Sequence, residues 1–180
     1  MNRESIHRDP AEERIEPADW DKLNRTLVIG CGNVLMGDDG LGPTFIKQAL
    51  KQTAGSPLAN EVTFIDAGTS IRSLLFSIVL TEPRPERIII VDAVDVGRAP
   101  GEVFEISLDD IPAVKSDDFS MHQLPTSNLL KELREQCGVE VRVVAVQVEY
   151  IPKEIRCGLS EPLLTALPKL QETVFGLLTI

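Results

Sequence analysis

TLVIGCGNVLMGDDGLG, residues 26–42, is the most informative stretch of the sequence. Its apolar run Leu27–Ile29 leads into a turn marked by Gly30 and Gly32, a pattern that predicts a buried strand ending in a tight turn. Two adjacent carboxylates, at positions 38 and 39, then precede a helical pattern over Leu41–Lys51. Open α/β sheets bind ligands at the carboxyl ends of their strands. Two acids at that edge would repel a phosphate group but would suit a cation.

The rest of the chain continues to alternate between strand and helix patterns. Further strands are predicted at Val62–Ile65, Arg87–Val91, Glu102–Ile106 and Val141–Val148, and further helices at Ser70–Leu80, Ser120–Gln136 and Ser160–Leu178. Arg87–Val91 is apolar on both faces, as in a central parallel strand, whereas Glu102–Ile106 alternates and suits an edge. We therefore predict an α/β fold, a three-layer αβα sandwich with a mostly parallel, twisted central sheet. Residues 1–24 are predicted to form a polar N-terminal arm and residues 25–180 a single domain.

Composition and charge exclude several classes of function. The 180 residues carry a net charge of −10 without any basic stripe, which argues against a nucleic-acid partner. No apolar run approaches the roughly 20 residues needed to span a membrane, and the polar N-terminus contains no signal segment. Three cysteines without CxxC spacing indicate reduced thiols. We expect a cytoplasmic monomer.

Acidic residues follow three of the predicted strands at or just beyond their carboxyl ends. These are Asp39, Asp66 and Asp92, and in a mostly parallel sheet such ends share one edge. The first turn of the helix predicted from Ser120 adds His122. Two carboxylates and one imidazole leave a divalent ion with open positions for substrate or water. We therefore predict a metal site formed by Asp39, Asp92 and His122.

Each of these residues also has a simpler interpretation. Asp38 or Asp39 can cap the helix that follows. Asp92 can pair with a backbone amide where its strand ends, and Asp66 can orient the turn after its strand. A lone histidine near a helix start is usually solvated or satisfied by a neighbour, and this applies to His122. Only the combination of these residues favours a metal site.

Other kinds of site fit the sequence less well. Gly30-Cys31-Gly32 resembles the start of a dinucleotide-binding turn, but the third glycine is absent and the following acids would oppose a pyrophosphate. A catalytic pair of Cys31 with a histidine would need a depressed thiol pKa, and nothing near those acids provides it. The sequence contains no GxxxxGK[ST], HExxH or GxSxG motif.

Four blocks, in order, resemble the nickel–iron hydrogenase maturation endopeptidases. The blocks are residues 30–42, residues 66–69, residues 89–95 with Pro100-Gly101, and residues 120–124. The resemblance covers Thr26–Leu178 and is greatest to the proteases that serve methanogen hydrogenases. Four ordered blocks are far more specific than any single motif.

The resemblance implies an endopeptidase that removes a C-terminal extension from the hydrogenase large-subunit precursor after nickel insertion. Its three metal-binding positions fall on Asp39, Asp92 and His122, the first of which is often Glu in the family. The nickel is expected to arrive with the substrate, and other divalent ions can occupy the site. Hard carboxylates compete poorly with the soft thiolates that hold nickel in the hydrogenase. The protease could therefore contact the nickel of its substrate without removing it.

Two mechanisms remain open, one metal-assisted and one like that of aspartyl proteases. In either case an activated water attacks the scissile carbonyl, and Asp38 is the candidate for an assisting carboxylate. The alternative function is a non-hydrolytic nickel-site checkpoint or chaperone for the same large subunit. The same three ligands would serve it.

Overall fold

The computed structural model describes residues 25–109 and 124–178, which are built around a five-stranded sheet. The strands are β1 (Thr26–Cys31), β2 (Val62–Gly68), β3 (Arg87–Val94), β4 (Val103–Ile106) and β5 (Glu140–Gln147). Their order is β2-β1-β3-β5-β4, and every pair is parallel except β4 with β5. The predicted central position of β3 and the antiparallel edge strand β4 are both confirmed. The arm predicted for residues 1–24 lies outside the described residues.

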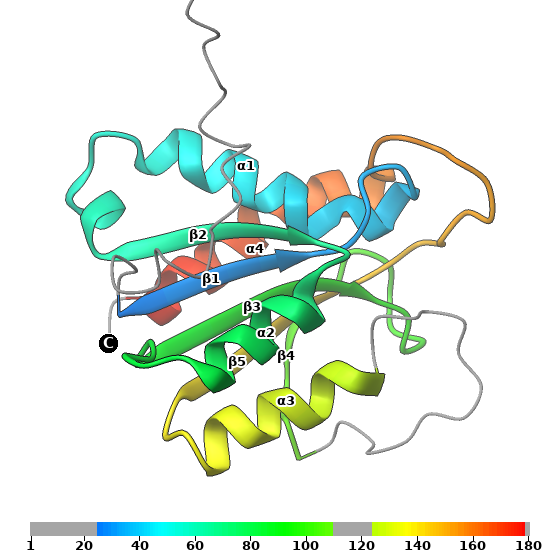
Figure 1. The fold of residues 1–180 in the computed structure, drawn as a ribbon. Helices are drawn as coiled ribbons and strands as arrows, with labels where there is room; N and C mark the ends of the chain where they lie inside the picture. The colour runs from blue at the N-terminus through cyan, green and yellow to red at the C-terminus, as the bar shows by residue number, and fades with distance from the viewer. Residues whose placement is uncertain (1–24, 110–123, 179–180) are drawn as a thin grey trace, which may run out of the picture.

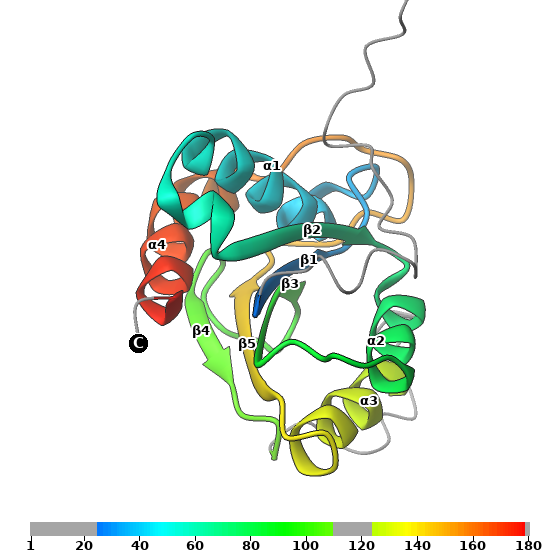
Figure 2. The ribbon, with the colours of Figure 1, turned by 60° about the vertical axis from the view of Figure 1, so that its left-hand side comes forward.

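Helices cover both faces of this sheet (Figures 1 and 2). They are α1 (Leu41–Thr53), α2 (Ile71–Leu80), α3 (Leu124–Glu135) and α4 (Glu161–Leu178), with 3-10 turns η3 (Gly37–Gly40) and η4 (Pro57–Asn60). Figure 2 shows α1 and α4 on one face and α2 and α3 on the other. The predicted three-layer αβα architecture is confirmed. Within the described residues, no helix combines the length and apolarity that a membrane span requires.

Alternating side chains of the central strands form two separate cores. Val28 and Ile89 belong to the core beneath α1 and α4, whereas Leu27 and Ile88 belong to the core beneath α2 and α3. Successive strand residues point to opposite faces. Both faces of β1 and β3 are therefore apolar, because helices bury both of them.

Two strands run further than their apolar runs predicted. β2 ends at Gly68 and β3 at Val94, three residues later than expected in each case. β3 continues because its backbone still pairs with β5 from Asp92 opposite Ala145 onward. Asp92 therefore lies within β3 and not after its end.

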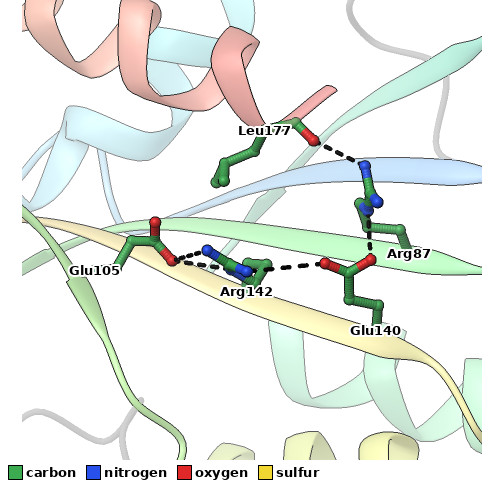
Figure 3. A network of polar contacts seen from close by, with 5 residues as sticks. All are labelled: Arg87, Glu105, Glu140, Arg142 and Leu177. Carbon is green, nitrogen blue, oxygen red and sulfur yellow. Dashed lines mark hydrogen bonds and ion pairs between the residues drawn. The ribbon is translucent and has the colours of Figure 1, made fainter. Parts of the chain in front are cut away.

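A polar network joins three strands and a helix near the amino ends of β3 and β5 (Figure 3). The Arg87 guanidinium donates to Glu140 at 2.8 Å and to the carbonyl of Leu177 in α4 at 2.8 Å. Arg142 binds Glu105 of β4 at 2.7 Å. This network holds the edge strand and the last helix at the end of the sheet opposite the predicted site.

Candidate active site

Glycines allow α1 to pack directly on the backbone of β1. A Cβ atom on Gly30 would lie 2.4 Å from the carbonyl oxygen of Gly42, and one on Gly42 would lie 2.2 Å from that of Cys31. Both distances are shorter than any real Cβ contact, so these positions require glycine. The close approach brings the residues just before α1 to the carboxyl end of β1.

The turn after β1 fixes the carboxylate of Asp39. Gly32 has a φ of +121°, and a Cβ there would lie 1.8 Å from the Asp39 carbonyl oxygen. The Asn33 N–H donates to Asp39 Oδ2 at 2.8 Å. Asp39 lies inside η3, whereas the N-cap positions of η3 and α1 are Met36 and Gly40. The described contacts therefore hold Asp39 over the turn and do not make it a helix cap.

Asp92 lies on β3, the neighbour of β1, and is half-buried. Its Oδ1 accepts a hydrogen bond from the Ala93 N–H at 2.9 Å, as the simpler interpretation expected. Burial nevertheless raises the pKa of Asp92 to about 7, opposed by the Ala93 amide and reinforced by the negative charge of Asp39. The two predicted carboxylate ligands are thus close enough to interact electrostatically.

The environment of Cys31 shows that all three strand-end acids converge. Burial raises the pKa of the Cys31 thiol well above its usual value, and the charges of Asp92, Asp39 and Asp66 raise it further. A thiol in this setting stays protonated at neutral pH, which argues against a catalytic Cys31. Cys31, Cys137 and Cys157 are all free, as predicted.

Asp66 is an exposed residue near the carboxyl end of β2, at the same edge of the sheet. Its Oδ1 accepts a hydrogen bond from the Gly68 N–H at 2.9 Å, and the Gly68 carbonyl accepts one from the Gly32 N–H at 3.0 Å. These contacts fix the end of β2 against the turn after β1. They support the interpretation that Asp66 orients this turn.

His122, the third predicted ligand, lies outside the described residues. Within residues 25–109 and 124–178, no group of three or more His, Cys, Asp and Glu side chains could hold a metal ion. The described part of the site is therefore a pair, Asp39 and Asp92. Two interacting carboxylates, of which Asp92 has a raised pKa, suit a divalent cation that would offset their mutual repulsion.

Asp38 has a different environment from its neighbour Asp39. Its side chain is 1% exposed, and its two oxygens accept hydrogen bonds from the N–H of Glu149 (2.9 Å), Tyr150 (3.5 Å) and Ser160 (2.7 Å) and from the Ser160 hydroxyl (2.9 Å). Asp38 also occupies no N-cap position. Its role as an assisting carboxylate stays a prediction.

Sequence reasoning did not identify the partner of Asp38. Ser160 was expected only to begin the last helix, and it does directly precede α4. Its hydroxyl, however, binds a residue 122 positions away, and no local pattern signals such a pair. Asp38 and Ser160 line a pocket of about 250 Å³ together with Tyr150, Arg156 and Leu159.

Several proteins with similar sequences are hydrogenase maturation proteases. The family model of the hydrogenase maturation protease HycI matches residues 46–177. A putative hydrogenase maturation protease of Methanocaldococcus jannaschii is 35% identical over 156 residues, covering 86% of this chain and 97% of that protein. The hydrogenase 3 maturation protease of Escherichia coli is 34% identical over 153 residues, covering 83% and 86%.

Solved structures agree with these sequence matches. The hydrogenase maturating endopeptidase HybD of Escherichia coli superposes with a TM-score of 0.66 at 27% identity, covering 86% of this chain and 91% of that one. The crystal structure of the hydrogenase 3 maturation protease gives a TM-score of 0.64 at 28% identity, covering 83% and 88%. The predicted resemblance, including that to methanogen proteins, is confirmed. This chain belongs to the hydrogenase maturation protease family.

Proposed function

We propose that this protease removes the C-terminal extension of a nickel–iron hydrogenase large-subunit precursor after nickel has been inserted. It recognises the nickel in the precursor through Asp39, Asp92 and His122. The observation that carries the proposal is the interaction of Asp39 with Asp92 at the carboxyl edge of the sheet. Family membership supports the proteolytic activity and the choice of substrate.

The carboxylate pair acts in this proposal by positioning the substrate. Nickel held by the precursor docks against Asp39 and Asp92, which places the scissile peptide at the edge of the sheet in register with the site. Metal binding keeps both carboxylates ionised, whereas Asp92 without metal gives up its proton only near pH 7. The complex with nickel-loaded precursor and the complex with nickel-free precursor therefore differ in the protonation of Asp92.

Two routes to the attacking water follow from this arrangement. In a metal-assisted route, the water is activated beside the nickel of the substrate. In an aspartic-like route, a carboxyl with a pKa near 7 exchanges the proton, and Asp92 fits that requirement better than an ordinary aspartate. Asp38 would assist in either route only by releasing hydrogen bonds to residues 149–160.

The test is to mix the protein with nickel-loaded precursor and to follow the precursor by intact mass spectrometry. The precursor is expected to shorten by the C-terminal extension, whereas nickel-free precursor stays intact. Asp39→Asn and His122→Ala are each expected to abolish processing while circular dichroism shows a folded protein. Binding of the loaded precursor without any change in its mass would favour the checkpoint or chaperone function instead. Unfolding of His122→Ala would show that this histidine is a core residue.

A further inference from the structure

Asp38 connects the start of the site to a segment more than 110 residues later in the chain. Residues 149–160, here called the 149–160 loop, run from the end of β5 to the start of α4. Both ends of this loop donate hydrogen bonds to the buried Asp38 carboxylate, Glu149 at 2.9 Å and Ser160 at 2.7 Å. Figure 1 shows the loop in orange beside the blue segment after β1. A single carboxylate thus closes the loop at its base.

The middle of the 149–160 loop is joined to the segment before Asp38. The Arg156 N–H donates to the Leu35 carbonyl at 2.9 Å, and the Gly37 N–H donates to the Arg156 carbonyl at 2.7 Å. Gly37 has a φ of +58°, and a Cβ there would lie 3.0 Å from Pro152 Cδ. The loop therefore packs along the segment that leads into Asp38 and Asp39.

Exposed apolar side chains gather on these two joined segments. Of the ten large apolar residues exposed among the described residues, five lie here: Val34, Leu35, Tyr150, Ile151 and Ile155. Ile155 is 74% exposed. Exposed apolar side chains that gather on joined segments mark interaction surfaces, and these begin one residue after Asn33, whose N–H binds the Asp39 carboxylate.

We infer that Asp38 is a positioning residue that holds both ends of the 149–160 loop at η3 and thereby forms the surface on which the protein substrate docks. The occupant is the precursor polypeptide, because the surface carries five exposed apolar side chains and begins one residue after Asn33, whose N–H binds the Asp39 carboxylate. The inference rests on the proposed function for the identity of that polypeptide. The role of Asp38 in ordering the loop does not depend on it.

The chemistry of Asp38 makes two substitutions informative. Every described partner of the Asp38 carboxylate donates a hydrogen bond to it. Asp38→Asn replaces one accepting oxygen with an NH2 group, which would face N–H groups and could not accept from them. Ser160→Ala removes the hydroxyl hydrogen bond and leaves the backbone one. Ser77→Ala is the matched control, because that hydroxyl donates only to the Ser73 carbonyl on the exposed face of α2.

The first experiment measures the order of the loop by limited trypsin digestion of the native proteins. Lys153 and Arg156 are exposed trypsin sites within the loop, and mass spectrometry identifies cleavage there. Asp38→Asn is expected to raise the cleavage rate at these sites by about tenfold, the factor for loss of one charge-assisted hydrogen bond, and Ser160→Ala by a smaller factor. Ser77→Ala is expected to match the wild type. Unchanged cleavage in Asp38→Asn and Ser160→Ala would overturn the inference, and Ser160→Ala alone decides it if Asp38→Asn fails to fold.

The second experiment separates docking from chemistry in precursor processing. Loss of the docking surface is expected to raise KM about tenfold in Asp38→Asn while kcat stays within about threefold. Asp38 and Ser160 belong to one hydrogen-bonded unit. The double variant Asp38→Asn/Ser160→Ala is therefore expected to have the same KM as Asp38→Asn alone. A fall in kcat of about a hundredfold or more, with an ordered loop and normal Ser160→Ala, would show an assisting carboxylate instead. A loosened loop with unchanged KM would overturn the docking role.

Failure of the proposed function gives a different result. In that case the wild type leaves the nickel-loaded precursor uncut, while the trypsin pattern still tests the loop. Precursor binding then replaces KM as the measure of docking. A dissociation constant about tenfold weaker in Asp38→Asn than in Ser77→Ala would support the inference, and equal constants would overturn it.

Discussion

Replacing Asp92 with asparagine is expected to stabilise the protein at alkaline pH while removing a predicted metal ligand. Asparagine has the shape of a protonated aspartate and keeps the Oδ1 acceptor used by the Ala93 N–H. It removes only the negative charge, which burial and Asp39 disfavour in the folded state. The free energy of unfolding should therefore rise at every pH where Asp92 of the unfolded wild-type chain is ionised.

The magnitude follows from the difference between the folded and unfolded pKa values. Asp92 has a pKa of about 7 in the folded protein against an ordinary 3.8, which corresponds to about 4 kcal/mol as an upper limit. Because the residue is half-buried, water and local relaxation reduce this value, and we expect a gain of about 1–3 kcal/mol.

The pH dependence has a defined sign. Between about pH 4 and pH 7, the folded protein holds a proton on Asp92 that the unfolded chain has released. Wild-type stability therefore falls as pH rises through this window, and the Asp92 contribution is constant above it. The advantage of Asp92→Asn should be near zero at pH 4, grow towards pH 7 and then stay level.

Urea unfolding followed by circular dichroism at about pH 5, 6, 7 and 8 measures this difference. Asp66→Asn is the matched control, because Asp66 lies at the same edge, is exposed and also accepts one backbone hydrogen bond that asparagine can retain. It is expected to change stability by less than about 0.5 kcal/mol. No gain for Asp92→Asn at pH 8, or the same gain at every pH, would refute a buried carboxylate that titrates near neutrality.

Three further outcomes are expected. Nickel(II) added to the wild type should raise Tm more at pH 8 than at pH 5.5, since protons compete for the carboxylates; a thermal shift assay in which Asp92→Asn responds equally would contradict this. Gly32→Ala should lower the free energy of unfolding by more than about 3 kcal/mol, because its Cβ would lie 1.8 Å from the Asp39 carbonyl oxygen; urea unfolding with a smaller loss would show that the turn can rearrange. Glu105→Gln should cost less than about 1 kcal/mol and leave processing unchanged, because its ion pair with Arg142 is solvent-exposed and lies away from the site; altered precursor cleavage would disprove that independence.

Local sequence patterns were sufficient to predict the sheet. Leu27–Ile29 and Arg87–Val91 are apolar on both faces, and helices bury both faces of the strands they form. The patterns missed where strands end, because β3 continues through Asp92 by pairing with β5, which is supplied by a later part of the chain. The end of β3 thus depends on its pairing with β5, which the apolar run of β3 does not reveal.

The site was predictable to the extent that it depends on topology. Parallel strands bring their carboxyl ends to one edge, so the approach of Asp39 to Asp92 followed from the predicted parallel sheet. The bonds of Asp38 to Glu149 and Ser160 did not follow, because they depend on the path of a loop after β5. Carboxylates in a strand-end turn look alike in sequence, and only their burial distinguishes them.

The adjacent acids at positions 38 and 39 illustrate why such a pair is not redundant. Both lie in the short turn η3, yet Asp38 is buried and accepts its hydrogen bonds from the 149–160 loop, whereas Asp39 accepts one from Asn33 and interacts with Asp92. The buried Asp38 is enclosed by the loop that it holds, whereas the half-buried Asp39 stays partly open to solvent and can meet a metal. Asp38→Asn should loosen the 149–160 loop, whereas Asp39→Asn should remove a proposed metal ligand, so the two substitutions should impair processing through different steps.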